Sequence, residues 1–89
     1  MSTVQQNEER WLSCLLDKGM FSDEIAVTYP RSGPIKKSVF VPRVKVRGKV
    51  GEGGTVRVVI IRASGKMMAV LPSSCRDVVV IAEADVSEQ

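Results

Sequence analysis

The chain has 89 residues, of which 44% are hydrophobic, and it carries 13 Lys and Arg against 10 Asp and Glu. This length leaves no room for a second core, so residues 1–89 are expected to form one small domain. The longest aliphatic runs, residues 58–61 and 78–82, are far shorter than the roughly 20 residues of a membrane-spanning helix. The polar N-terminus does not look like a signal peptide, so we expect a cytoplasmic protein without a membrane span.

The charges are segregated along the chain. Residues 31–76 hold eleven Lys or Arg and one acid, Glu52. Residues 1–30 and 77–89 together hold nine acids and two cations. A cationic central block therefore lies between acidic ends, and it is expected to bind an anionic partner or the acidic ends themselves.

The first expected element is an amphipathic helix over about residues 5–18. Its apolar residues recur at intervals of three and four, as on one face of a helix: Trp11, Leu12, Leu15 and Leu16. Gly19 then suits a helix C-terminus. This apolar stripe has to be buried, either against the rest of the domain or against a second copy of the chain.

From residue 24 onward the apolar residues alternate with a period of two, which is typical of strands. Five strands are expected, over about residues 24–29, 38–50, 55–63, 66–71 and 78–83. The second is long enough that Pro42 or Gly48 is expected to mark a bend, a bulge or an edge. Five short strands joined by turns predict a mainly β fold, a small antiparallel barrel preceded by the N-terminal helix.

A two-residue turn at Ser64-Gly65 defines the register of the last long hairpin. It places Val59 opposite Val70 and Ile61 opposite Met68. These four side chains then share one face of the sheet and form an apolar strip. Such a strip is unsuited to water and predicts an interface.

The preceding hairpin closes through "GEGG", residues 51–54. One extra residue in this turn would place Val46 opposite Ile60 and Arg47 opposite Val59, which keeps the two faces distinct. The inner face is then expected to be uniformly apolar: Val44, Val46, Val58, Ile60, Ala69 and Leu71. The outer face would carry the apolar strip beside a row of cations.

That row occupies alternate positions of the predicted second strand: Arg43, Lys45, Arg47 and Lys49. Alternate strand residues share a face, so the row can follow the phosphates of RNA or DNA. The predicted nucleic-acid-binding residues are this row and four further cations: Arg57, Lys36, Lys37 and Arg31. Aromatic residues are few, which favours backbone contact with little base specificity, with Tyr29 and Phe40 as candidates for stacking and Trp11 in the core.

Two alternatives to nucleic-acid binding remain open. The acidic residues near the two ends, Glu8, Glu9, Asp17, Glu83 and Asp85, are able to neutralise the row within one chain. In a homo-oligomer or a protein adaptor, the acidic ends would instead meet the cationic strand of another subunit. The predicted interface for such an assembly consists of Val59, Ile61, Met68 and Val70, with Trp11 and Leu15 from the N-terminal segment.

Catalysis and metal binding have little support in the sequence. The chain has no histidine, and its two cysteines, Cys14 and Cys75, are not part of a CxxC pair. Both are expected to be buried free thiols. No base is available to activate a nucleophile, so we expect a binding protein without catalytic residues, a metal site or a cofactor.

The order of a helix, five strands, a glycine-containing hairpin and a turn before the last strand resembles the layout of Sm-like and SH3-like small barrels. The resemblance covers most of the chain and concerns layout alone. The Gly-Asp and Asn signature of Sm proteins has no counterpart near Val41–Gly54, and the peptide-binding positions of SH3 domains are missing. An oligonucleotide-binding fold is a further alternative, although a helix between the third and fourth strands has no room. These resemblances imply a fold and little about function.

Overall fold

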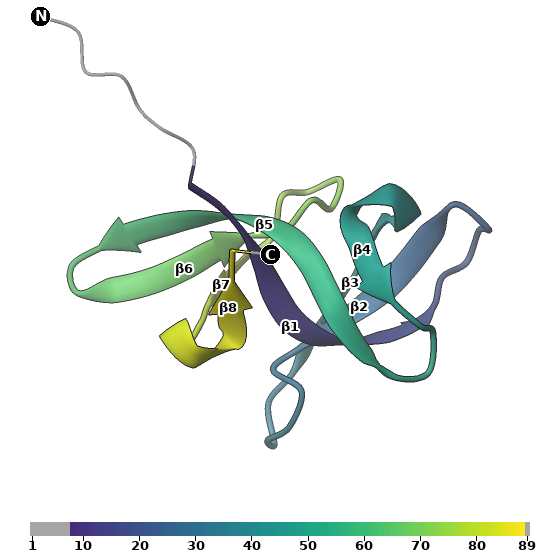
Figure 1. Ribbon diagram of the computed structural model, residues 1–89, viewed down its shortest axis with the longest axis horizontal. Helices are drawn as coiled ribbons and strands as arrows, with labels where there is room; N and C mark the ends of the chain where they lie inside the picture. Colours follow the sequence, from purple (N-terminus) through teal and green to yellow (C-terminus); the bar gives the residue numbers. More distant parts are fainter. Residues whose placement is uncertain (1–7, 89) are drawn as a thin grey trace, which may run out of the picture.

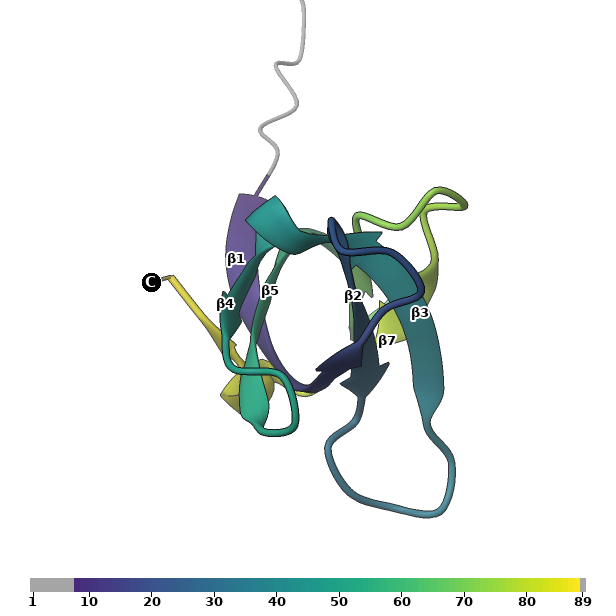
Figure 2. The same cartoon turned by 90° about the vertical axis from the view of Figure 1, so that its right-hand side faces the viewer.

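The computed structural model describes residues 8–88 (Figure 1). They form one antiparallel sheet, whose strands are joined by loops, and two single turns of 3-10 helix. The elements are β1 (Glu8–Lys18), β2 (Glu24–Tyr29), β3 (Lys37–Pro42), η1 (Arg43–Lys45), β4 (Val46–Gly48), β5 (Gly53–Ala63), β6 (Lys66–Val70), β7 (Val78–Val80), η2 (Glu83–Asp85) and β8 (Val86–Ser87). The strand order is β3-β2-β1-β5-β6-β7, while β4 pairs with β5 and β8 pairs with β1. The sheet curls into an open half-barrel around its core (Figure 2).

The predicted N-terminal helix is wrong, because residues 8–18 form the long central strand β1. The part of that prediction that covers residues 5–7 lies outside the described residues. Leu12, Cys14 and Leu16 point into the core at a period of two, between the paired neighbours β2 and β5. The apolar residues of this segment fit the spacing of a helix as well as that of a strand. The hydrogen bonds to two neighbouring strands outweigh the helical spacing, because intrinsic helix propensity contributes little to stability.

The predicted strand 24–29 is confirmed with the same bounds, and β5 and β6 cover most of the predicted strands 55–63 and 66–71. The predicted strand 78–83 is shorter than expected, because β7 ends at Val80. A continuous strand over 38–50 is wrong. The expected bend at Pro42 is confirmed, since the chain leaves β3 there and makes the turn η1 before β4. Within residues 8–88 the sheet therefore has eight strands and is not a five-stranded barrel.

The hairpin at Ser64-Gly65 has the predicted register, with Val59 opposite Val70 and Ile61 opposite Met68. Ser64 and Gly65 have φ values of 53° and 74°, as this type of tight hairpin turn requires.

The register predicted for the preceding hairpin is wrong, because Val46 lies opposite Val56 and Arg47 opposite Thr55. Gly48 and Gly54 pair closely here, and a Cβ on Gly54 would lie 2.3 Å from the Arg47 carbonyl oxygen. The shift from the predicted partners is an even number of residues, so it leaves the inner and outer faces unchanged. For this reason the predicted inner face is largely correct. Its one wrong member is Val44, which is 86% exposed because η1 turns it outward.

The core lies inside the curl of the sheet and draws on almost every strand. Its buried members are Leu12, Cys14, Leu16, Ile25, Val27, Tyr29, Val41, Val56, Val58, Ile60, Ala69, Leu71 and Ile81. Burial raises the pKa of the Cys14 thiol to about 11. The expectation of two buried thiols is wrong for Cys75, which is exposed.

The C-terminal segment is attached to the core through Tyr29. The Tyr29 hydroxyl donates a hydrogen bond to Asp85 Oδ2 at 2.6 Å and accepts one from the Ala82 amide at 3.1 Å. A buried hydroxyl needs such partners. The prediction of Tyr29 as a stacking platform is therefore wrong, since its ring is buried and its hydroxyl is engaged.

Candidate nucleic-acid interface

The outer face of β1, β4 and β5 carries Trp11 beneath two guanidinium groups. Because Leu12 points into the core, strand alternation turns Trp11 to the outer face, where it stands opposite Arg57 on β5. The Arg47 guanidinium carbon lies 3.9 Å from the centre of the Trp11 ring, and that of Arg57 lies 5.9 Å away. Trp11 is only 9% exposed, so this part of the surface presents cations stacked on an aromatic ring. Trp11 is buried as expected, but on a strand and outside the main core cluster.

Arg31 extends this charge along β1. Its Nη1 atom donates to Ser13 Oγ at 3.4 Å, two residues beyond Trp11 on the same face. The guanidinium also lies against Gly53 of β5, where an added Cβ would be 2.5 Å from Arg31 Nη2. A glycine at this position leaves room for the Arg31 guanidinium. Arg31, Lys45, Arg47 and Arg57 are called the cationic surface below.

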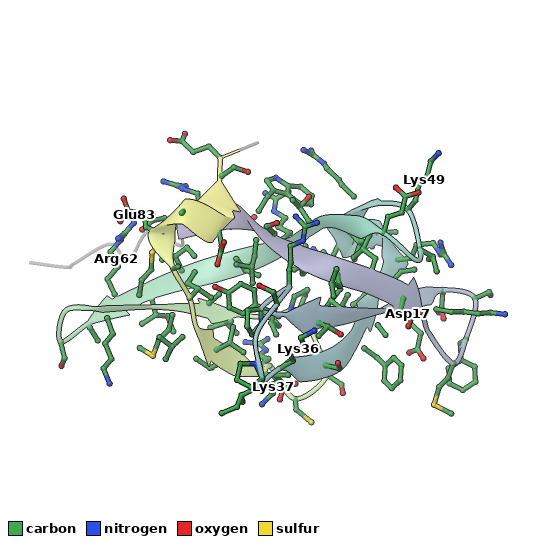
Figure 3. The ribbon with its side chains drawn as sticks, turned by 90° about the horizontal axis from the view of Figure 1, so that it is seen from below. Asp17, Lys36, Lys37, Lys49, Arg62 and Glu83 are labelled. Carbon is green, nitrogen blue, oxygen red and sulfur yellow. The ribbon has the colours of Figure 1, made fainter. Side chains whose placement is uncertain are left out.

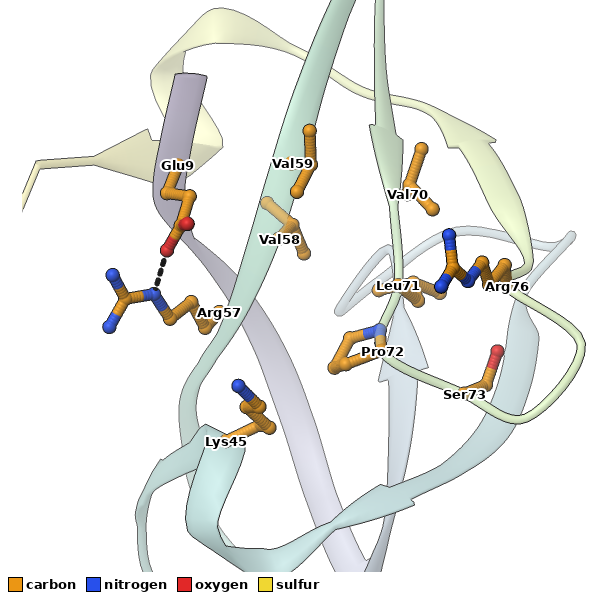
Figure 4. A pocket seen from close by; sticks show the side chains of 10 residues that line it. All are labelled: Glu9, Lys45, Arg57, Val58, Val59, Val70, Leu71, Pro72, Ser73 and Arg76. Carbon is orange, nitrogen blue, oxygen red and sulfur yellow. Dashed lines mark hydrogen bonds and ion pairs between the residues drawn. The ribbon is translucent and has the colours of Figure 1, made fainter. Parts of the chain in front are cut away.

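Next to this surface a cleft with a volume of about 430 Å³ opens between β4 and β6 (Figure 4). It is lined by Glu9, Lys45, Arg57, Val58, Val59, Val70, Leu71, Pro72, Ser73 and Arg76. Lys45 and Arg57 lie on one side and Arg76 on the other, with aliphatic side chains between them (Figure 4). The cleft therefore has an aliphatic floor between polar rims, with a cation on each rim and Glu9 beside Arg57.

Arg76 was not among the predicted site residues. It lies in the loop between β6 and β7 and has a positive φ of 51°. Arg76 is far from the cationic row in the sequence, so no local pattern indicates that they share a site. It reaches the cleft because β6 folds back beside β5 and the loop that follows β6 lies next to the cleft.

The acidic N-terminal end is partly paired with β5. Glu9 forms an ion pair with Arg57, and Glu8 Oε2 lies 3.0 Å from Arg62 Nη2 and 3.2 Å from Arg10 Nη2. The hydrogen bond from Arg62 lowers the pKa of the Glu8 carboxyl, with a smaller Coulombic contribution from Arg10. The prediction of pairing within one chain therefore holds for Glu8 and Glu9, but their partners are Arg57 and Arg62 on β5 and Arg10 on β1, and not the predicted row.

The other three predicted acidic partners lie elsewhere. Asp85 binds the Tyr29 hydroxyl, and the Asp17 carboxylate accepts a hydrogen bond from the Lys18 amide. Glu83 is close enough to act on Arg62 electrostatically, and the two lie together in Figure 3. None of these contacts involves the row from Arg43 to Lys49.

The predicted row is not a continuous line, because η1 interrupts it. Arg43 is held at the turn after β1, where its backbone amide donates to the Asp23 carbonyl at 2.8 Å and its Nε to the Ser22 carbonyl at 2.9 Å. Lys49 lies in the loop after β4, beside a second hollow that Arg43 also lines. Only Lys45 and Arg47 join the cationic surface.

Lys37 is engaged away from the cationic surface, and Figure 3 shows Lys36 beside it. Lys37 Nζ lies 3.1 Å from Asp77 Oδ1. The hydrogen bond from Ser73 and then that from Lys37 lower the pKa of the Asp77 carboxyl. The structure thus brings together four of the eight predicted cations and places the others at separate sites.

The predicted apolar strip lies on the outer face of β5 and β6, and β7 extends it. Val78 stands opposite Val70 and Val80 opposite Met68, so all share one face. The six residues, called the apolar outer face, are Val59, Ile61, Met68, Val70, Val78 and Val80. Leu15 lies apart from them, opposite Gly53 at the other end of β5, and Trp11 is covered by the cations.

The fold is an open, curled antiparallel sheet, and it has a cationic outer surface beside a cleft. Within residues 8–88, no helix is long and apolar enough to cross a membrane, and no group of three or more His, Cys, Asp or Glu is placed to hold a metal ion. The chain matches no protein-family model, and comparisons with curated proteins and with solved structures gave no significant match. The functional argument therefore depends on the geometry of this surface.

Proposed function

We propose that this protein binds nucleic acid by contacting backbone phosphates with its cationic surface. The observation that carries the proposal is the stack of Arg47 and Arg57 on Trp11, flanked by Arg31 on one side and Lys45 on the other. Each phosphate that these residues neutralise releases counterions, which favours binding at low salt. Base specificity is expected to be small, because phosphate contacts carry no direct sequence information.

The stacked arginines suit this role better than free surface cations. Packing on Trp11 limits the freedom of the Arg47 and Arg57 side chains, so less conformational entropy is lost when they bind a phosphate. The ion pair of Arg57 engages its Nε with Glu9, which orients the planar group toward the outer face. A guanidinium also presents several donors in a geometry that matches phosphate oxygens.

The test is the salt dependence of binding to labelled RNA and DNA, measured by fluorescence anisotropy. A variant with Arg31, Lys45, Arg47 and Arg57 all replaced by Gln is expected to bind much more weakly. The slope of log K against log salt should fall by about three, the loss of roughly four phosphate contacts. The matched control replaces four exposed cations that lie elsewhere: Lys18, Lys36, Lys49 and Lys66.

The control variant has the same net charge as the first and is expected to keep most of the affinity and slope. Equal losses in both variants would mean that binding follows net charge and not this surface. Failure of the wild-type protein to bind any nucleic acid at low salt would end the proposal.

The apolar outer face favours a second function, assembly with another copy of the chain. Ile61, Val78 and Val80 are 40%, 48% and 62% exposed, and they continue into Val59, Met68 and Val70. A contiguous aliphatic face of this kind is typical of an interface. Light scattering of the wild-type protein should then give the mass of an oligomer, and the double variant I61E/V80E should be a monomer. A wild-type monomer at high concentration would rule this assembly out.

A further inference from the structure

We propose that the cleft between β4 and β6 receives one unstacked base of a single-stranded nucleic acid whose phosphates lie on the cationic surface. This inference rests on the proposed function and adds a substrate class, single strands in preference to duplexes. It is carried by the way the cleft is built, by the direction of the backbone at Arg57, and by the chemistry of its two rims.

The cleft exists because two short strands share one edge of β5. β4 pairs with residues 54–56 and β6 with residues 59–63, so neither covers residues 57 and 58. On one side, the turn η1 draws the chain away before Val46. On the other, Pro72 follows β6 at the register position opposite Arg57 and has no N–H to continue the ladder. A gap in the sheet is therefore built into the sequence.

The backbone of Arg57 points into this gap. The Leu71 amide donates to the Asp77 carbonyl, and the Ile81 amide donates to the Met67 carbonyl. Alternate residues of a strand direct their amide and carbonyl to the same neighbouring strand, so Ala69, which lies between Met67 and Leu71, also bonds to β7. The amide and carbonyl of Val70 therefore face the other neighbour, β5.

Val59, the partner of Val70, therefore faces β6 with its own amide and carbonyl. Arg57 lies two residues earlier on β5 and has the same orientation, away from β1. No strand of the described chain pairs with Arg57 on this side. The Val46–Val56 pairing directs the Arg57 amide at the Lys45 carbonyl, so the Arg57 carbonyl is the backbone group directed at whatever occupies the cleft.

The chemistry of the lining matches a nucleotide. Val59, Val70 and Pro72 offer apolar contact to the flat face of a base, and the volume of about 430 Å³ is in the range of small-molecule sites. A base in a strand has a phosphate on each side, and the cleft has Lys45 and Arg57 on one rim and Arg76 on the other (Figure 4).

Continuity of charge favours a nucleic acid over an acidic peptide as the occupant. Arg57 belongs both to the cationic surface and to the cleft, so a strand that follows the surface passes the opening. In a duplex the bases are stacked and paired, and insertion would require one of them to be unstacked first. The cleft therefore selects single strands.

Three probes of equal length test the inference on the full-length protein: a 12-nucleotide single-stranded DNA, its duplex, and a 12-unit abasic DNA strand that keeps the phosphates and lacks the bases. The wild-type protein is expected to bind the single strand about tenfold more tightly than either of the others, a typical effect of one base contact. Binding only through phosphates predicts equal affinity for the single strand and the abasic strand.

Two variants locate the effect. V70E places a carboxylate in the cleft and is expected to remove the preference for the single strand over the abasic strand. The matched control is V80E, which adds the same charge to the apolar outer face outside the cleft. R76G removes one rim cation at a positive φ that glycine adopts without strain, and it should weaken single-strand binding about threefold.

Circular dichroism and thermal unfolding establish that each variant is folded, and R76G keeps the test decisive if V70E does not fold. Equal wild-type affinity for the single strand and the abasic strand would overturn the inference and leave the proposed function intact. Identical effects of V70E and V80E, or equal competition by an acidic peptide of matched charge, would overturn the inference in the same way. No binding of any of the three strands would overturn the proposed function as well.

Discussion

The two halves of β5 have the same backbone geometry and opposite outer surfaces. In the first half, which lies between β1 and β4, the outer face carries Arg57 over Trp11. In the second half, which lies beside β6, the outer face carries Val59 and Ile61. The inner face is apolar from Val56 to Ile60, which spans parts of both halves, so one core supports a cationic surface and an apolar one. The cleft lies at the boundary, where β4 has ended and β6 has not yet begun.

Neighbouring strands therefore decide what an outer face of this sheet can do. Arg57 is useful as a cation because Trp11 stands opposite it and Arg47 lies over the same ring. Val59 and Ile61 become part of a large apolar face because β6 and β7 add four more aliphatic side chains. Four sets of variants test this contrast between the two halves of β5.

The largest effect is expected for L12A, which affects both halves of β5 equally. Leu12 is fully buried in the shared core opposite Val56. Its truncation should lower the free energy of unfolding by about 2–5 kcal/mol, through lost apolar burial and the cavity left behind. Urea denaturation followed by circular dichroism measures this loss. A change of less than about 1 kcal/mol would contradict a common core beneath the two surfaces.

A smaller and selective effect is expected for G54A, which should damage the cationic half alone. The added Cβ would meet the Arg47 carbonyl oxygen at 2.3 Å and the Leu16 Cδ1 atom at 2.5 Å, so β4 has to move off β5. The cost should be about 1–3 kcal/mol.

Hydrogen exchange should show faster exchange in β4 and unchanged protection in the β5-β6 hairpin for G54A. The control G51A changes a glycine in the loop before β5, where nothing lies within 4 Å of the added Cβ, and its cost comes only from the positive φ of 89°. Uniform loss of protection across the sheet would contradict the separation of the two halves.

The third prediction concerns the link between the C-terminal segment and the core. Y29F removes the hydrogen bond to Asp85 and leaves the Ala82 amide without that acceptor, so it should cost about 1 kcal/mol. D85N is the matched partner variant, since an amide oxygen can still accept from the tyrosine. Thermal unfolding should rank the wild type above D85N and D85N above Y29F. Equal melting temperatures for Y29F and the wild type would contradict the role given to this hydroxyl.

The smallest effect is expected from pH, through Glu8 at the apolar end of β5. Its folded-state pKa is lowered below the ordinary value of 4.5, chiefly by the Arg62 hydrogen bond. A lowered folded pKa means that this carboxylate stabilises the fold above pH 4.5 and that the contribution disappears as the pH falls through the folded pKa.

E8Q should therefore flatten the loss of stability between about pH 5 and pH 3, with little change at pH 7 beyond that of a surface ion pair. E52Q, which alters an exposed carboxylate in the loop after β4, is the control. Unfolding midpoints are measured at each pH for both variants and the wild type. An unaltered acid slope in E8Q would show that the ion pair with Arg62 contributes nothing.

The local sequence pattern predicted the structure correctly wherever it fitted one type of element. The alternation in residues 24–29 predicted β2 with its bounds, and the pair Ser64-Gly65 predicted both a turn and its register. The apolar strip of β5 and β6 followed from that register and lies on one face as expected. In each case the side chains or the turn residues themselves specify the geometry, because strand alternation and positive φ are local properties.

A mainly β chain with a segregated cationic block, an apolar strip and one tight hairpin could be derived from the amino-acid sequence alone. The strand at residues 8–18 could not, since its spacing fits two periods and the hydrogen bonds of β2 and β5 select one of them. Long-range packing also splits the cationic row at η1, stacks Arg47 on Trp11 and brings Arg76 to the cleft. These contacts join residues far apart in the chain, and no local period encodes which distant strand lies alongside.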